Sequence, residues 1–154
     1  MNLVDELHAI ANALARGGIT YAICGGIAVT IHGATRTTKD IDLLVERKDV
    51  PAVLDAVRPL GYAFAALPMT FDANTERERH VQRVTKLEGT EHLILDLLIA
   101  EAAFEGLLAE RVEVALPAGT LSVVPRATLL KMKRLAGRPQ DQADIEKLET
   151  ENEP

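Results

Sequence analysis

Three aspartates constrain this sequence most, because each of them interrupts a segment that is otherwise typical of a buried strand. Asp40 and Asp42 stand two residues apart at the start of an apolar run, and Asp96 lies inside the apolar run 93–99. Residues i and i+2 of a strand point to the same face, so the first two carboxylates share a face. Carboxylates in apolar surroundings repel one another unless a cation lies between them. The pattern therefore predicts a site for Mg²⁺ or Mn²⁺, which prefer oxygen ligands.

The stretch just before the first two aspartates is suited to a phosphate-bearing substrate. Gly25 and Gly26 stand between a predicted strand and a predicted helix, where free backbone N–H groups and the absence of a side chain allow close approach of phosphate. No G-K-[ST] sequence follows them, so they do not form a P-loop. Arg36 and Thr38 lie in a polar loop, and an arginine can bind phosphate through two hydrogen bonds. Two-ion nucleotidyl transfer is favoured, with a phosphodiesterase or nuclease as an alternative.

The remaining pattern predicts an α/β or α+β fold with a mixed sheet flanked by helices. We expect one domain over residues 1–148 and an acidic tail over 149–154. Residues 61–77 contain Pro68 and a polar run, which indicates a loop. Helices are expected at 3–16, 27–32, 49–58, 101–110, 126–137 and 140–149, and strands at 19–24, 41–46, 80–87, 92–100, 111–117 and 120–125.

Composition excludes several classes of protein. A chain of 154 residues that is 47% apolar can bury a core without disulfides, and its single cysteine, Cys24, fits a reducing cytoplasm. No secretory leader and no membrane-spanning run is expected. Five aromatic residues and no tryptophan disfavour a base-stacking platform for RNA. The net charge of −6 arises mostly from residues 139–154, which hold six acids and one lysine, so it does not exclude a nucleotide or a tRNA end as substrate.

A longer motif surrounds these residues. The block G-G-I-A-V-T-I-H-G-A-T-R-T-T-K-D-I-D resembles the signature of the nucleotidyltransferase superfamily typified by DNA polymerase beta, and it is most similar to small bacterial members of the abortive-infection toxin and minimal-nucleotidyltransferase type. The run H-L-I-L-D-L-L is similar to the third-carboxylate strand of that family. Residues 123–145 resemble its C-terminal Lys…Arg-x-x-Asp-x-x-Asp helical pair. Gly26 departs from the serine found in many polymerase-like members.

The resemblance implies the nucleotidyltransferase fold and an enzyme that moves a nucleoside monophosphate from an NTP such as ATP to a hydroxyl group, with Mg²⁺ or Mn²⁺ as cofactor. It implies that Asp40 and Asp42 bind both metal ions and that Asp96 binds the ion that activates the acceptor. The acceptor would be a tRNA end, a protein or a small molecule, and a toxin–antitoxin setting would add a cognate toxin or antitoxin as partner. The residues implied in nucleotide binding are Gly25, Gly26, Arg36, Thr38 and Lys133.

Plain structural interpretations stand beside these functional ones. The aspartates could be surface or cap groups, and Lys133 could belong to a solvated basic run. Asp141 and Asp144 are expected to be ordinary charges in the first turns of a helix, where the helix dipole favours them, and their family role is left open. Cys24 is expected in the core, and His32 is expected to be packed or hydrogen-bonded. The alternative function is a non-catalytic module with the same fold that docks a protein partner.

Overall fold

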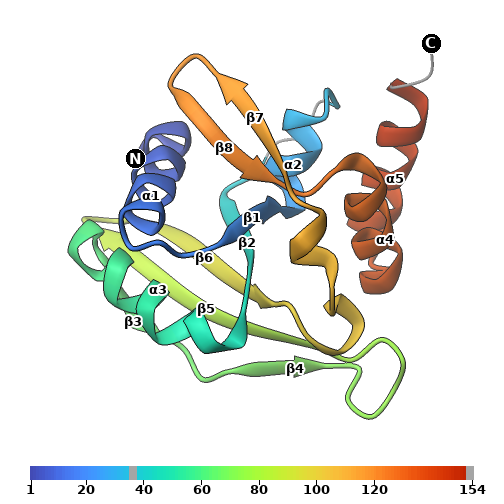
Figure 1. Cartoon of the computed structure of the whole chain (residues 1–154), viewed down its shortest axis with the longest axis horizontal. Helices are drawn as coiled ribbons and strands as arrows, with labels where there is room; N and C mark the ends of the chain where they lie inside the picture. The colour runs from blue at the N-terminus through green and yellow to red at the C-terminus, as the bar shows by residue number, and fades with distance from the viewer. Residues whose placement is uncertain (35–37, 152–154) are drawn as a thin grey trace.

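The computed structural model describes residues 1–34 and 38–151. This part of the chain forms a mixed sheet of eight strands, with helices on both of its faces (Figure 1). The strands are β1 (Tyr21–Cys24), β2 (Asp40–Val45), β3 (Tyr62–Ala65), β4 (Met69–Phe71), β5 (Arg79–Glu88), β6 (Glu91–Ile99), β7 (Val112–Leu116) and β8 (Gly119–Val123). Their spatial order is β3-β5-β6-β2-β1-β8-β7, and β4 pairs with β5 outside this path.

Besides the strands, the described residues form five α-helices and four short 3₁₀ turns. None of these helices is both long enough and apolar enough to cross a membrane. In Figure 1, α1 and α3 lie on one side of the sheet and α4 and α5 on the other. The helices are α1 (Leu3–Arg16), α2 (Gly25–Ile31), α3 (Val50–Val57), α4 (Arg126–Ala136) and α5 (Pro139–Glu151), and the 3₁₀ turns are Arg47–Asp49, Arg58–Leu60, Ala102–Phe104 and Leu107–Glu110.

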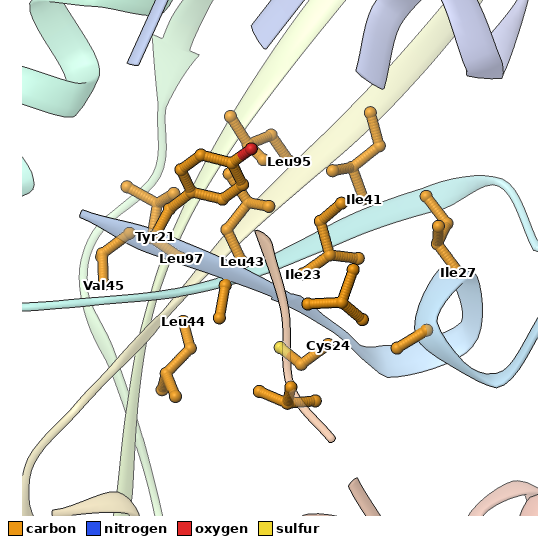
Figure 2. Close-up of a cluster of buried hydrophobic side chains, with 14 of the residues drawn as sticks. Tyr21, Ile23, Cys24, Ile27, Ile41, Leu43, Leu44, Val45, Leu95 and Leu97 are labelled. Carbon is orange, nitrogen blue, oxygen red and sulfur yellow. The ribbon is translucent and has the colours of Figure 1, made fainter. Parts of the chain in front are cut away.

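Side-chain alternation gives the central strands two different faces. Figure 2 shows Ile41 and Leu95 on one side of the sheet, and Cys24 and Leu44 on the other. The first side is apolar along β2 and β6 and packs into the main core, which is expected for strands buried between layers. Asp40, Asp42 and Asp96 occupy the alternate positions, so they face the side that α4 covers. The core holds the strands rigidly, and the polar positions of the same strands are thereby fixed in place.

The predicted fold class is confirmed, because the sheet is mixed and flanked by helices. Two segments differ from expectation. Residues 61–77 contain β3 and β4 rather than only a loop, because both short strands pair with the long strand β5. Residues 101–110 form two 3₁₀ turns rather than one helix, because Ala102 and Gly106 have positive φ angles of 52° and 80°, which a continuous helix does not allow. Cys24 is fully buried, and His32 Nε2 lies 2.8 Å from the carbonyl oxygen of Val124, as expected.

Candidate functional site

The structure brings the three predicted aspartates together. Strands β2 and β6 are parallel neighbours, and their register pairs Asp42 directly with Asp96. Asp40 lies two residues before Asp42 and therefore shares its face. All three line one pocket of about 310 Å³. A volume of this size is at the lower end of the range for small-molecule sites, roughly 300–1,000 Å³.

Burial places an electrostatic cost on the charged form of Asp42. Burial raises the pKa of its carboxyl to about 7, and repulsion from Asp96 and Asp40 adds to the effect. The positive charges of Lys133 and Arg138 lower the pKa but do not outweigh the loss of water. No hydrogen bond or ion pair joins the Asp42 carboxylate to another side chain in the described ranges. A bound cation would offset the cost of keeping this carboxylate ionised.

Asp96 already has a positively charged partner. Arg83 stands opposite Asp96 in the antiparallel pair of β5 and β6. Its Nε and Nη2 groups donate to the two carboxylate oxygens at 2.8 and 2.9 Å, a two-pronged ion pair. These hydrogen bonds raise the pKa of the Arg83 guanidinium. Within residues 1–34 and 38–151, no three acidic, histidine or cysteine side chains are arranged as a ready metal site. Because Arg83 already binds both oxygens of Asp96, a cation at this carboxylate competes with the guanidinium.

The glycine pair lies against the aspartates. Gly25 has a φ of +66°, and a Cβ atom built on it would lie 2.0 Å from Oδ2 of Asp42. No other residue fits this position without moving the carboxylate. Gly25 and Gly26 both line the pocket, so their backbone lies beside the cluster of charges. The two glycines therefore lie next to the aspartates, as the sequence predicts.

The loop ahead of β2 is only partly described. Arg36, predicted to contact phosphate, lies outside the described residues. Thr38 lines the pocket, and its hydroxyl is 3.3 Å from the carbonyl oxygen and 3.4 Å from the amide nitrogen of Asp40. These long contacts indicate a local role for Thr38 at the start of β2.

Lys133 also lines the pocket, but it lies between two carboxylates of α5. Its Nζ is 3.3 Å from Asp141 Oδ1 and 2.9 Å from Asp144 Oδ2. All three residues are buried, so the interpretation of Asp141 and Asp144 as ordinary helix charges is wrong. Burial alone would raise the pKa of Asp141, but a hydrogen bond from Arg138 and the charge of Lys133 lower it below its usual value. The group joins α5 to α4 next to the pocket.

Several pocket residues were not singled out from the sequence. Arg138 leaves 71% of its side chain exposed at the pocket while its Nε donates to Asp141. Arg83, Met69 and Phe71 line the opposite end. The alternation of residues 80–87 already placed Arg83 on one face of a strand. Its position beside Asp96 depends on the register of two strands, which the alternation alone does not fix.

The sequence also matches a described protein family. Residues 1–132 match the family described as uncharacterised nucleotidyltransferase. A comparison with functionally curated proteins gives no significant match. The family match includes both glycines and all three aspartates, and it ends within α4.

Solved structures of similar fold extend over nearly the whole chain. The lincosamide antibiotic adenylyltransferase LnuA with bound lincomycin has 16% identity and a TM-score of 0.64, covering 95% of this chain and 96% of that one. ANT(2″)-Ia in complex with adenylyl-2″-tobramycin has 18% identity and a TM-score of 0.61, covering 96% and 88%. A candidate nucleotidyltransferase from Thermotoga maritima has 12% identity and a TM-score of 0.66, covering 97% and 93%. At these identities the likeness shows the fold alone, which is the nucleotidyltransferase fold.

Proposed function

The chain belongs to the uncharacterised nucleotidyltransferase family, and from that premise we propose that it transfers a nucleoside monophosphate from an NTP to a hydroxyl group and releases pyrophosphate. The observation that carries this proposal is the convergence of Asp40, Asp42 and Asp96 beside Gly25 in one pocket. A pocket with crowded carboxylates next to open backbone suits a ligand that arrives as a metal–phosphate complex.

The three aspartates would hold Mg²⁺ or Mn²⁺. The fit rests on their oxygen-only donor set and on Asp42, whose raised pKa is the mark of a carboxylate that lacks a compensating cation. When bound, the ions neutralise phosphate charge and make the acceptor hydroxyl easier to deprotonate. Asp96 would bind an ion in place of Arg83. Because its strand pairs with β5, we assign Asp96 to the side of the pocket where the acceptor binds.

The other implied residues receive roles on the phosphate side. Gly25 and Gly26 would leave room for the triphosphate next to Asp42, because a side chain at Gly25 would fill that space. Arg36 and Thr38 would support the phosphates from the loop before β2. Lys133 would act through its positive charge while it stays paired with α5.

The transfer itself changes two bonds at the α-phosphorus. The acceptor oxygen forms a bond to this phosphorus, the bond to the bridging oxygen breaks, and pyrophosphate leaves with the electron pair. The hydroxyl proton passes to solvent. The residues contribute mainly by orienting the reactants and by balancing charge.

The acceptor class and the cellular setting are further parts of the proposal. Two of the solved structures are an antibiotic adenylyltransferase and a complex with adenylyl-tobramycin, which favours a small-molecule acceptor. A tRNA end or a protein hydroxyl, as in a cytoplasmic toxin–antitoxin system, is the other proposal. Fractionating a labelled cell extract into RNA, protein and small molecules identifies which fraction takes the nucleotide.

The experiment that tests the function incubates the full chain with each radiolabelled NTP, Mn²⁺ or Mg²⁺ and cell extract. We expect label transfer that requires the metal and is lost in Asp40→Asn and Asp42→Asn. Asp55→Asn is the matched control, because Asp55 is 73% exposed and lies on α3, away from the pocket. No transfer with any NTP, together with no metal-dependent rise in Tm, would contradict the proposal and favour the binding module.

A further inference from the structure

The pocket extends beyond Asp96, away from the glycines. Side chains at alternate positions of a strand face the same side, and β5 pairs antiparallel with both β4 and β6, which aligns such positions across the sheet. In the strand order this region lies on the far side of β6 from β1 and Gly25. We call it the β4–β5 end of the pocket, and it consists of Met69, Phe71, Arg79, Val81, Arg83 and Leu98.

The two arginines of this end differ in how their charges are used. Arg79 leaves only 11% of its side chain exposed, and its Nη1 donates to the Asp72 carboxylate and to the carbonyl oxygens of Arg77 and Leu135. Arg79 is therefore part of the framework. Arg83 leaves 39% of its side chain exposed, and two of its nitrogen atoms donate hydrogen bonds to Asp96. A guanidinium has five N–H donors, so Arg83 retains capacity for a ligand in the pocket.

Among the described residues, Asp96 is the carboxylate that accepts hydrogen bonds from Arg83, while Asp40 and Asp42 favour its charge from a distance, and the proposed function turns all three carboxylates to cations. When Asp96 turns to a divalent cation, the guanidinium loses the carboxylate that now neutralises it. Among the described residues that line the pocket, the one carboxylate besides the three aspartates is Asp141, which is already paired with Lys133 and Arg138. The β4–β5 end itself has no acidic side chain to offer a cationic ligand.

We propose, resting on the proposed transferase function, that Arg83 binds the acceptor through an oxyanion, a phosphate or a carboxylate, that lies close to the modified hydroxyl group. The guanidinium forms two parallel hydrogen bonds with either group. The substrate class that follows is a hydroxyl compound with negative charge, and polycationic acceptors are disfavoured.

The apolar part of the same surface extends this description of the acceptor. Phe71 is 43% exposed, and Met69, Val81 and Leu98 line the pocket around it. A flat or apolar body of the acceptor would cover these side chains while its oxyanion contacts Arg83. An acceptor with a ring, a hydroxyl group and an adjacent negative charge matches the β4–β5 end best.

The test uses three probes that share a phenyl β-D-pyranoside body and differ at C6, which is neutral in phenyl β-D-glucoside and anionic in its 6-phosphate and in phenyl β-D-glucuronide. The full chain is first saturated with Mn²⁺ and a non-hydrolysable NTP analogue, and probe binding is then measured by calorimetry. We expect both anionic probes to bind about 10- to 100-fold more tightly than the neutral one, as charge-assisted hydrogen bonds predict. Tobramycin serves as the polycationic probe and is expected to bind more weakly than either anion.

Variants separate acceptor binding from a purely structural role of Arg83. Arg83→Gln should bring the affinity ratio of anionic to neutral probe close to one, and Arg83→Lys should retain part of it. Arg58→Gln, at an exposed arginine paired with Asp55, should leave the ratio unchanged. If Arg83 serves Asp96 alone, its loss alters binding of all probes equally and the ratio persists, which overturns the inference.

The same titration distinguishes this inference from the function on which it rests. The NTP analogue with Mn²⁺ should raise the Tm of the wild-type chain and should raise that of Arg83→Gln by at least as much, since no guanidinium then competes with the cation for Asp96. If the analogue produces no rise, the proposed function fails. If the analogue raises the Tm but the anionic probes bind no more tightly than the neutral probe, only the acceptor assignment is wrong. The same holds if the anionic probes do not bind at millimolar concentration.

Discussion

The ionised form of Asp42, which the proposed activity requires, is unfavourable for folding. It is held between Gly25, Cys24 and Asp96, where burial and two like charges oppose its ionised form. A residue of this kind lowers the stability of the protein that contains it, unless a ligand compensates for the charge. Retention of an aspartate at such a position is understandable if the charge serves binding.

Replacement of Asp42 by asparagine should therefore stabilise the metal-free protein at pH 8 and abolish nucleotide transfer. The amide has nearly the same shape and removes the buried charge, so we expect a Tm increase of several degrees, at roughly 2–4 °C per kcal/mol for a domain of this size. Differential scanning calorimetry in EDTA measures it. A lower Tm for Asp42→Asn than for wild type would show that the charge is already well compensated.

The raised pKa of Asp42 also predicts a pH dependence in the metal-free protein. Its carboxyl titrates near 3.8 when unfolded and at about 7 when folded, so the folded state binds more protons between these values. The free energy of unfolding should then fall as pH rises from about 4 to 7, and Asp42→Asn should show a smaller fall. Urea unfolding across this window provides the measurement, and identical pH profiles for the two proteins would contradict the assignment.

Metal binding should depend on pH in the opposite direction. A divalent cation requires the ionised carboxylate and releases the proton held by Asp42, so Mn²⁺ affinity should increase as pH rises from 6 to 8. Isothermal titration in two buffers of different ionisation enthalpy reveals the proton released. Affinity that does not change with pH would mean that Asp42 is not a ligand.

At the scale of elements, the contact between α4 and α5 depends on charges that are out of water. Lys133 reaches Asp141 and Asp144 across this contact, and Leu148 of α5 is fully buried nearby. The same two helices also share an exposed ion pair between Arg134 and Glu149. The contact between these two helices therefore contains both buried and exposed ion pairs, so their contributions to stability can be compared directly.

Removing the buried cation should cost much more than removing the exposed acid. Lys133→Met removes the buried positive charge that faces Asp141 and Asp144, and a loss of about 3–5 kcal/mol in the free energy of unfolding is expected. Glu149→Gln, at a side chain that is half exposed, should cost less than about 1 kcal/mol. Denaturant unfolding of both variants gives the comparison. Similar losses for the two would mean that the buried pair adds nothing beyond a surface pair.

For the molecule as a whole, the fold continues past the segment that matches the family. The match ends at residue 132, whereas α5 contributes the buried side chains Ile145 and Leu148 and both carboxylates that hold Lys133. Arg126 of α4 donates to the carbonyl oxygen of Leu148 at 2.6 Å, which fixes the far end of α5. We infer that α5 belongs to the same folding unit as the sheet.

Two truncations test this unit. A chain that ends at residue 148 loses only exposed or undescribed residues and should keep its Tm within about 2 °C, as expected for surface changes. A chain that ends at residue 138 loses α5 and exposes its apolar contacts with α4, a cost comparable to the 5–15 kcal/mol that stabilises a typical domain. Circular dichroism should show no cooperative thermal transition for the shorter chain. A cooperative transition near the wild-type Tm would show that α5 is an appendage.

The sequence predicted those features that depend on local periodicity. Asp40, Asp42 and Asp96 were recognisable because charge interrupts an apolar strand at a fixed spacing, and the structure brings all three into one pocket. Features that depend on long-range register were not predictable in the same way. Arg83 meets Asp96 only because β5 pairs with β6 in one register. Asp141 was misinterpreted because an acid in the first turn of a helix looks the same whether solvent or a buried lysine faces it.

We expect this pocket to transfer a nucleoside monophosphate and not a phosphoryl group. Transfer from NTPs that carry the label either at the α- or at the γ-phosphorus, with Mn²⁺ and cell extract, tests it most directly. The α-label should be incorporated into an acceptor, the γ-label should appear in pyrophosphate, and Asp42→Asn should abolish both. Incorporation of γ-label that depends on the added chain, or of α-label that persists in Asp42→Asn, would show that the pocket does not carry out this transfer.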